Sequence, residues 1–270
     1  MSASPRGPEK VVFVGGTPRS GTTITHAVLC AAPGVNGYVP EASFFVHLVK
    51  AYYAGVTHWD IHTHGLYPDA ETFRLSIAAA AEAVLQDLWR HVGRPRVLCL
   101  KDPLMTEWFP WAARLLPDAR FVTVCRHPFD VVRSRQDGYE RTSGEPFTLE
   151  MALDVARDYL RDYQSVLSHN FRGRHLMFRY EDLNTARVLS AMAKLVEAPG
   201  FVASRLWQTP DGRLRTSFGS DDDPTSSPKY GGSIDLTPRL DPLRADWQAA
   251  VAAICRPVMM RMNYPWQDAA

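Results

Sequence analysis

The segment GTPRSGTT, residues 16–23, has the composition and spacing of a loop that binds a phosphate group. Glycines at its first position and at Gly21 let backbone N–H groups turn toward one anion, and the helix expected after the loop adds its positive end. Loops that bind nucleoside triphosphates carry a lysine where this sequence has Thr22. Arg19 offers a fixed fork of donors instead, and Thr22 and Thr23 add hydroxyl groups. These residues favour an anion site over a purely structural turn, but a site that does not reach a terminal phosphate.

A second candidate anion site lies in FVTVCRHPFDVVRSRQ, residues 121–136. Arg126 follows an apolar run that predicts a strand, and open α/β sheets bind ligands at the carboxyl ends of their strands. Pro128 suits the first position of a helix, which places Ser134 two turns further along. One guanidinium and one hydroxyl can hold one phosphate group. Taken alone, the pattern fits a capped helix with surface arginines equally well.

Four apolar runs predict the strands that position these residues. They contain Val, Leu and Phe without strict polar alternation, as strands do when a parallel sheet is covered on both faces. The runs are Val11–Val14, Arg96–Leu100, Arg120–Cys125 and His175–Phe178.

Between and after these runs, apolar residues recur with the period of a helix. The pattern predicts helices over Phe73–Val92, Met151–Leu167 and Leu243–Ile254. Pro257 is expected to end or kink the last of them. Strands that alternate with helices predict an α/β fold of three layers, in which a central, mostly parallel sheet is flanked by helices around a phosphate-type loop.

Composition limits the function classes. The chain has 270 residues, is 46% hydrophobic and carries a formal net charge of +1, so a general basic surface for nucleic acid is not indicated. Its apolar runs are too short to span a membrane, and its first residues lack the apolar region of a signal peptide. We expect a cytoplasmic protein without nucleic-acid or membrane partners, with a tail at residues 1–9 and one domain at residues 10–270. Irregular loops are expected near residues 37–65 and 209–232.

Cysteine and histidine could in principle bind metal. The four cysteines, Cys30, Cys99, Cys125 and Cys255, are far apart in the sequence and show no paired-ligand spacing. Cys99 and Cys125 lie in apolar runs and are expected to be core residues, and the cysteine pattern favours a reduced protein. His58, His62 and His64 have a spacing that zinc sites use, but nothing else in the sequence asks for a metal. No metal is therefore expected, and these histidines are expected in a loop near a substrate or in the core.

Taken together, the motifs resemble those of sulfotransferases that use 3′-phosphoadenosine-5′-phosphosulfate (PAPS). TPRSGTT and CRHPFDVVRS carry most of the resemblance, with Arg126 and Ser134 eight positions apart. Three further segments are similar to elements of that family: LKDP from Leu100, FRYEDL from Phe178, and KYGGS from Lys229. The matching segments extend from Val11 to about Ser233.

The resemblance implies a role for each matching residue. The 5′-phosphosulfate would be held by the residues of the first loop: Pro18, Arg19, Ser20, Gly21, Thr22 and Thr23. The 3′-phosphate would be held by Arg126 and Ser134, and Tyr180 would help to place the adenine. The late motif would close over the 3′-phosphate end through Lys229, Tyr230 and Gly231. The absent lysine then has a reason, since PAPS has no γ-phosphate to reach and needs no metal to bridge one.

The reaction implied is transfer of a sulfonyl group to an acceptor hydroxyl or amine, with release of adenosine 3′,5′-bisphosphate (PAP). Lys101 and Arg19 are the candidates for meeting the charge that grows on the bridging oxygen. Glu41, which lies 22 positions after Arg19, is the candidate general base. Asp102 is the alternative base, or a buried partner of a cation. Glu41 could instead cap a helix that begins near Ser43.

Other interpretations stay open at the level of sequence. Asp102 after an apolar run could hold magnesium in a phosphate-loop kinase or nucleoside triphosphatase, although Thr22 counts against that class. A nonenzymatic nucleotide-binding module is a third candidate. For a sulfotransferase, we expect a soluble small-molecule or natural-product acceptor, and the aromatic residues of segment 37–65 suggest that it is apolar or aromatic.

Overall fold

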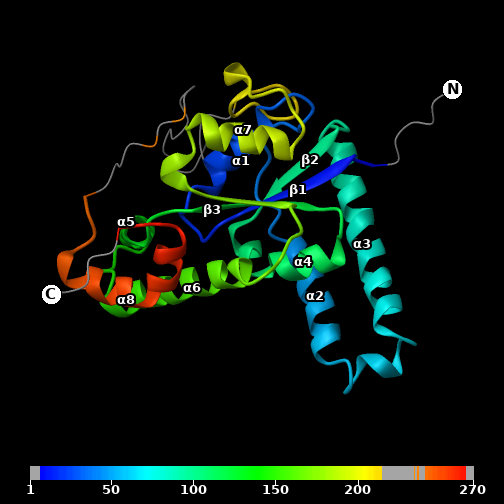
Figure 1. Ribbon diagram of the computed structural model, residues 1–270, viewed down its shortest axis with the longest axis horizontal. Coiled ribbons are helices and arrows are strands. Elements are labelled where there is room, and N and C mark those ends of the chain that lie inside the picture. The colour runs from blue at the N-terminus through cyan, green and yellow to red at the C-terminus, as the bar shows by residue number, and fades with distance from the viewer. Residues whose placement is uncertain (1–6, 215–233, 235, 237–240, 266–270) are drawn as a thin grey trace.

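The computed structural model describes residues 7–214, 234, 236 and 241–265. Within them, four parallel strands form one sheet in the order β2-β1-β3-β4 (Figure 1). The strands are β1 (Lys10–Gly15), β2 (Val97–Lys101), β3 (Arg120–Cys125) and β4 (His175–Arg179). Each lies on one of the predicted apolar runs, so the expected parallel sheet and the α/β fold are confirmed.

The register of the sheet brings the chemically active segments to one edge. Val14 of β1 pairs with Lys101 of β2, and the next residue of β1, Gly15, pairs with Thr123 of β3. Cys125 at the end of β3 pairs with Arg179 at the end of β4. Because all four strands are parallel, the segments that follow them leave the sheet together at its carboxyl edge.

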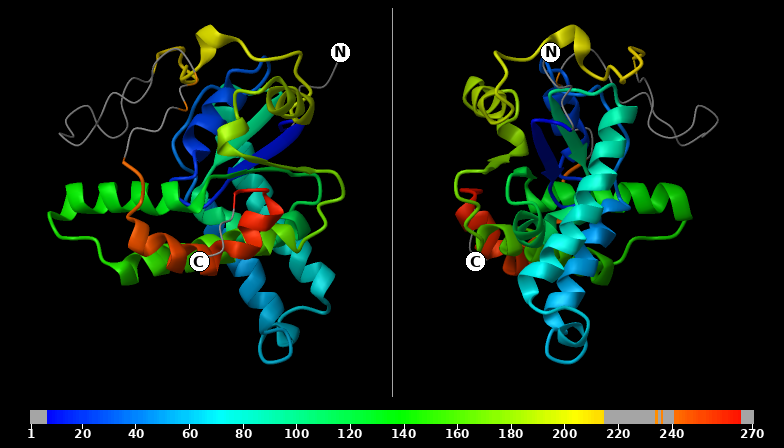
Figure 2. Two further views of the ribbon diagram at one scale, coloured as in Figure 1. Left: turned by 60° about the vertical axis from the view of Figure 1, so that its left-hand side comes forward. Right: turned by 90° about the vertical axis from the view of Figure 1, so that its right-hand side faces the viewer.

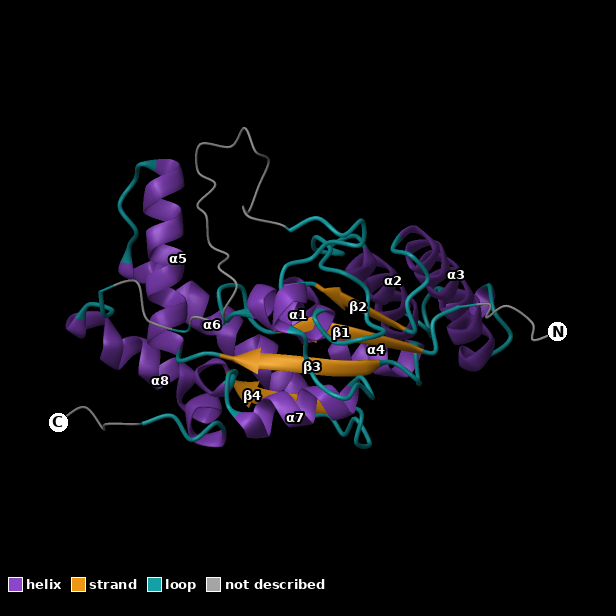
Figure 3. Ribbon diagram, turned by 90° about the horizontal axis from the view of Figure 1, so that it is seen from above, coloured by secondary structure: helices purple, strands orange, loops and turns teal. Residues whose placement is uncertain are grey.

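Helices cover both faces of the sheet, as seen from above in Figure 3. Alternate residues of β1 point to opposite sides: Val12 and Val14 join one apolar core, whereas Phe13 joins another. The first core is covered by α1 (Thr22–Cys30) and α7 (Ala186–Leu195). The second core is covered by α2 (Phe45–Thr57), α3 (Ala70–His91) and α4 (Phe109–Leu115).

A third core forms beside the sheet, between three more helices. These are α5 (Pro128–Ser143), α6 (Leu149–Leu167) and α8 (Ala245–Arg261). Short 3-10 turns connect the larger elements at Thr63–Gly65, Pro103–Trp108, Tyr180–Asp182 and Ala203–Arg205.

Pro257 lies inside α8, which continues to Arg261, so of the two expected effects of this proline, ending or kinking the helix, the first does not occur. Cys255, Val258 and Met259 around it are buried in the third core. This burial offsets the backbone hydrogen bond that the proline removes.

The segment 37–65 was expected to be irregular, but its middle forms α2. Phe45, Val49 and Tyr52 have helical spacing and are buried, and α2 packs against α3 to form a hairpin that projects from the sheet (Figures 1 and 2). Of the second expected loop, residues 209–214 are described and include an antiparallel bridge between Gln208 and Leu214. The rest of that loop lies outside the described residues. Among the helices that are described, none has both the length and the apolar character needed to cross a membrane.

Candidate active site

The loop between β1 and α1 depends on two glycines. Gly16 has φ 149° and donates its N–H to Thr106 Oγ1 over 2.6 Å, and a Cβ there would lie 2.3 Å from the Val124 carbonyl oxygen. Gly21 has φ 98°, and a Cβ there would lie 2.3 Å from the ring of Tyr180. Side chains are excluded at both positions, so the backbone turns tightly enough to present its N–H groups to an anion.

Helix α6 packs against this loop and is hydrogen-bonded to it. Thr17 donates its N–H to Tyr163 Oη over 3.2 Å, and Tyr163 donates its hydroxyl to the Val124 carbonyl over 2.8 Å. Asp162, the preceding residue, is buried, and burial raises its pKa to about 7 although a hydrogen bond from Thr17 opposes the shift. Sequence reasoning missed both α6 residues, because the helical period of α6 indicates which face is buried but not what that face touches.

Arg19 joins the loop to the second predicted site. Its backbone has φ 77°, and its Nε donates to Ser134 Oγ on α5 over 3.0 Å. Arg126 donates weakly to the Arg19 carbonyl, over 3.4 Å. A cavity of about 450 Å³ opens beside this contact, between α5 and α6. Although Arg19 as a residue is exposed, desolvation of its guanidinium and then repulsion from Arg141 and Arg135 lower its pKa, as expected where cations gather around an anion site.

Arg126 follows the carboxyl end of β3 directly. Its guanidinium stacks on the ring of Tyr180, 4.9 Å from the centroid, and the same ring packs on Gly21. Its Nε is buried, lies 3.7 Å from Asp130 Oδ2, and has no hydrogen-bond partner in the described part of the chain. A buried N–H donor without a hydrogen bond, and with only a distant carboxylate to offset its lost solvation, is suited to bind an oxyanion.

Lys101 and Glu41 form an ion pair at the other side of the loop. The Lys101 side chain is fully buried at the end of β2, and its Nζ lies 2.6 Å from Glu41 Oε1 and 3.2 Å from Thr23 Oγ1. The Glu41 side chain is 38% exposed, so its carboxylate faces the open side of the pair. The N-cap residue of α2 is Phe44 and no side chain caps that end, so the capping interpretation of Glu41 was wrong.

Asp102 follows Lys101 but has a different environment. It is 3% exposed, and its Oδ1 accepts the N–H of Leu104 over 3.0 Å, which caps the 3-10 turn after β2. Burial, and the nearby charge of Glu41, raise its pKa against the opposing effects of that hydrogen bond and of Lys101. Its other oxygen is buried without a hydrogen-bond partner among the described residues. No described set of three His, Cys or carboxylate groups that could share a metal ion includes Asp102.

Those predicted residues of the two anion sites that the structure describes thus meet at one edge of the sheet. Lys229, Tyr230 and Gly231 lie outside the described residues. His58, His62 and His64 lie at or after the far end of α2, whose 13 residues give it a length of about 20 Å (Figure 2). They are not among the described groups that could bind a metal, and His58 and His64 contact backbone carbonyls of Ala54 and Trp59.

The sequence of this chain is similar to those of known sulfotransferases. The sequence model of the sulfotransferase family matches residues 11–200. A putative protein-tyrosine sulfotransferase of Caenorhabditis briggsae is 31% identical over 127 residues, which are 47% of this chain and 42% of the relative. The protein-tyrosine sulfotransferase of Drosophila melanogaster is 29% identical over 125 residues, 43% of this chain and 23% of the relative. The chain therefore matches less than half the length of these curated relatives.

Solved structures show the same fold at low sequence identity. The sulfotransferase domain from the curacin biosynthetic pathway aligns with a TM-score of 0.54 at 17% identity, over 97% of this chain and 100% of that one. The sulfotransferase domain from the Synechococcus PCC 7002 olefin synthase aligns with a TM-score of 0.56 at 18% identity, over 99% of each chain. A sulfotransferase from Mycobacterium avium aligns with a TM-score of 0.56 at 14% identity, over 98% of this chain and 79% of that one.

Proposed function

Because the chain belongs to the sulfotransferase family, we propose that it transfers the sulfonyl group of PAPS to a hydroxyl or amine of a soluble small-molecule acceptor and releases PAP. The observation that carries the proposal is the arrangement of three groups around one loop. Arg126 and Ser134 lie on the β3 side, and the Lys101–Glu41 pair lies on the β2 side. A donor that carries a phosphate group on both the 3′ and the 5′ side of its ribose matches one anion site in the loop and a second at Arg126 and Ser134 beside it.

The residues of the site fit this donor. The backbone of the loop, with Thr22 and Thr23, would bind the phosphosulfate, and the buried Nε of Arg126 would gain the oxyanion partner that it lacks. Tyr180 is fixed between Gly21 and the Arg126 guanidinium, so its ring is a rigid surface for a base. When bound, PAPS supplies an activated sulfonyl group on a leaving phosphate.

Lys101 and Glu41 have complementary roles in the transfer. Lys101 donates to the bridging oxygen as negative charge grows there, and burial strengthens this interaction. Glu41 accepts the proton of the acceptor as its oxygen or nitrogen forms the new bond to sulfur. Glu41 is preferred to Asp102 because its carboxylate is exposed to an approaching acceptor, whereas Asp102 is buried and caps a turn.

Arg19 is the one catalytic candidate whose side chain lies elsewhere. Its Nε hydrogen-bonds to Ser134, on the 3′-phosphate side of the loop. We propose that it acts there in donor binding, and that Lys101 is the main cation at the reacting sulfur.

A protein tyrosine is the second candidate acceptor. It is favoured by the printed names of the curated relatives, which are protein-tyrosine sulfotransferases. The two acceptor classes separate in one experiment, in which the purified chain is incubated with labelled PAPS and either a panel of phenols, alcohols and amines or tyrosine-containing peptides. Mass spectrometry then reports the gain of one sulfonyl group, and the class with the higher kcat/KM identifies the acceptor.

The roles of the ion pair are tested with Glu41→Gln and Lys101→Met. Both variants should bind PAP with nearly unchanged affinity but turn over about 10²- to 10⁴-fold more slowly, because they remove groups used in the transition state. Glu71→Gln, on the surface of α3, is the matched control and should keep full activity. Full turnover by Glu41→Gln would exclude Glu41 as the base. Phosphate transfer from ATP that depends on magnesium would favour the kinase class instead, and PAP binding without any transfer would favour a binding module.

A further inference from the structure

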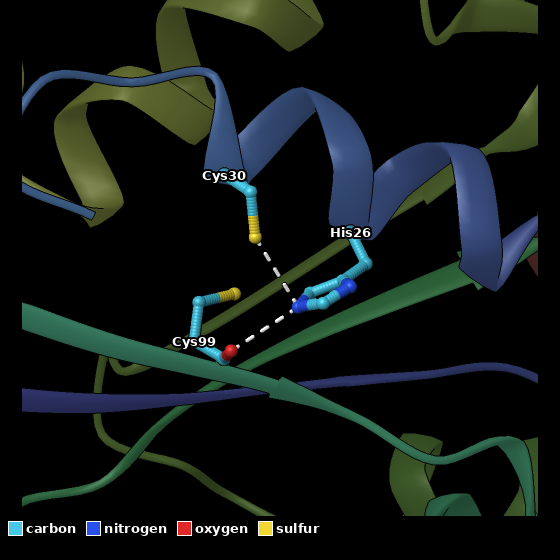
Figure 4. A group of neighbouring side chains, drawn as sticks. All are labelled: His26, Cys30 and Cys99. Atoms are coloured by element: carbon cyan, nitrogen blue, oxygen red, sulfur yellow. Dashed lines mark hydrogen bonds between the residues drawn. The ribbon is translucent and has the colours of Figure 1, made fainter. Parts of the chain in front are cut away.

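A histidine and a cysteine of α1 converge with a cysteine of β2 that is distant in the sequence (Figure 4). His26 and Cys30 are four residues apart on α1, so they lie on the same face of the helix. Cys99 faces them from β2. We propose that His26, Cys30 and Cys99 form a buried binding site for a thiophilic divalent cation of the zinc type.

The distances fit a metal centre. The three ligand atoms all lie within 4.8 Å of one another, and His26 Nε2 lies 3.3 Å from Cys30 Sγ. Around a tetrahedral zinc ion, bond lengths of about 2.0 Å to nitrogen and 2.3 Å to sulfur separate neighbouring ligands by about 3.6 Å. His26 and Cys30 already lie near this separation, and the ligand atoms that are up to 4.8 Å apart would need to approach by about 1 Å to enclose an ion. The Cys99 carbonyl oxygen, 3.1 Å from His26 Nε2, is the nearest candidate for a fourth ligand.

Burial and charge select the kind of ion. His26 and Cys99 are 0% exposed and Cys30 is 1% exposed, within the core formed by Val12, Val97 and their neighbours. Two thiolates and a neutral imidazole balance a divalent cation, whereas a monovalent cation would leave an uncompensated negative charge in an apolar core. A hard cation such as magnesium is excluded by the soft ligands.

Asn36, which is not one of the three proposed metal ligands, holds Cys99 in place by two hydrogen bonds. Its side-chain oxygen accepts the Cys99 N–H over 2.6 Å, and its side-chain nitrogen donates to the Cys99 carbonyl over 3.0 Å. The strand is therefore fixed at this residue before any metal binds, which lowers the loss of entropy on coordination.

Binding has a defined proton balance. Each thiol loses its proton as its sulfur bonds to the metal, and the imidazole binds through Nε2 as the ring proton moves to Nδ1. Nδ1 has no hydrogen-bond partner in the described part of the chain and is free to take that proton. One ion therefore releases about two protons. Simple packing, with His26 hydrogen-bonded to the Cys99 carbonyl, releases none.

The site would join the two elements that the transfer reaction uses. Helix α1 begins with Thr22 and Thr23 of the phosphate loop, and Cys99 lies two residues before Lys101 on β2. A metal bound between them would fix the distance between the loop and the lysine without touching a substrate. The inference does not depend on the proposed acceptor or donor.

The test measures metal content first. Protein isolated from zinc-supplemented medium, and protein refolded with zinc, should each contain about one zinc ion per chain by elemental analysis, with about two protons released per ion on refolding. Refolding with cobalt(II) should give the intense visible and near-ultraviolet bands of a tetrahedral thiolate complex. Cys30→Ser and Cys99→Ser should lose the ion. Cys125→Ser and Cys255→Ser, which change equally buried thiols elsewhere, should keep it.

The wild-type measurements decide the matter even where a variant fails to fold. Less than about 0.1 equivalent of zinc after refolding, or cobalt spectra without thiolate bands, would overturn the proposal. Zinc retained by folded Cys30→Ser and Cys99→Ser, as judged by undiminished PAP binding, would do the same, because the ion would then lie elsewhere.

Discussion

Asp162→Asn should make the folded protein more stable at neutral and alkaline pH. Asp162 lies on α6 beneath the phosphate loop, where Thr17 donates a hydrogen bond to it and the nearest cation, Arg161, is 3.9 Å away. Glu107 and Asp158 are the other charged groups that act on it, and both oppose its ionisation. A carboxylate in this position loses more solvation than its partners return.

The size of the effect follows from the pKa. Burial raises the pKa of Asp162 from 3.8 to about 7, so the folded state binds the proton more tightly than the unfolded state. Its contribution to stability is therefore present below about pH 4 and is lost as the pH rises to 7. Three pKa units correspond to about 4 kcal/mol in the free energy of unfolding. Asparagine has nearly the same shape, still accepts from Thr17, and carries no charge at any pH.

The assay is urea unfolding of the wild type and the variant at several pH values from 4 to 8. The difference in unfolding free energy, variant minus wild type, should be close to zero at pH 4 and rise to about 4 kcal/mol at pH 8. Other titrating groups contribute equally to both proteins and cancel in the difference. Asp154→Asn, about two turns earlier on α6 with a side chain that is 65% exposed, is the control and should show no such rise. A difference that stays flat with pH would show that Asp162 is ionised without penalty, and the reasoning about its burial would fail.

Two further predictions concern the carboxyl edge of the sheet, and a third concerns the start of β4. Ser134→Ala should weaken PAP binding about 10- to 100-fold in calorimetry, because it removes a hydroxyl that accepts a hydrogen bond from Arg19 and would bind a phosphate. Unchanged affinity would show that Ser134 is not part of the anion site. Gly21→Ala should weaken PAP binding at least as much, because its Cβ collides with Tyr180, whereas Gly138→Ala, with no atom within 4 Å of the new Cβ, should bind normally. His175, at the start of β4, has a pKa lowered to about 4 by burial and then by His169, so its protonation alone should remove about 3 kcal/mol of unfolding free energy as the pH falls from 6.5 to 4, opposite in sign to the effect of Asp162. His175→Gln should lose less over that range in urea titrations, and an identical loss would contradict the assignment.

The strands were predictable from sequence because a parallel sheet covered on both faces needs continuous apolar runs. Helix α2 was not predicted, although Phe45, Val49 and Tyr52 have helical spacing, because the many aromatic and histidine residues of its segment suggested a loop. The continuation of α8 through Pro257 was also missed. It depends on packing against α6, which local sequence does not reveal.

The candidate site likewise has parts that the sequence predicts and parts that depend on how distant segments pack. The places of the phosphate loop, Lys101 and Arg126 at one edge of the sheet could be predicted because each ends or directly follows a predicted strand, where the chain direction alone fixes its place. The support of the loop by Asp162 and Tyr163 depends on where a distant helix packs. No sequence spacing records such contacts, and the convergence of Cys30 with Cys99 was hidden for the same reason.

The strand order explains how one loop can serve two chemically distinct neighbours. Since β1 lies between β2 and β3, the loop that follows β1 has Lys101 on one side and Arg126 on the other. If β2 lay between β1 and β3 instead, Lys101 would separate the loop from Arg126, and the hydrogen bond from Arg19 to Ser134 could not form. In the proposed reaction, the β1–β2 side then governs transfer and the β1–β3 side governs donor affinity. Changes confined to the β2 side should therefore alter kcat more than PAP affinity, and changes on the β3 side should do the reverse.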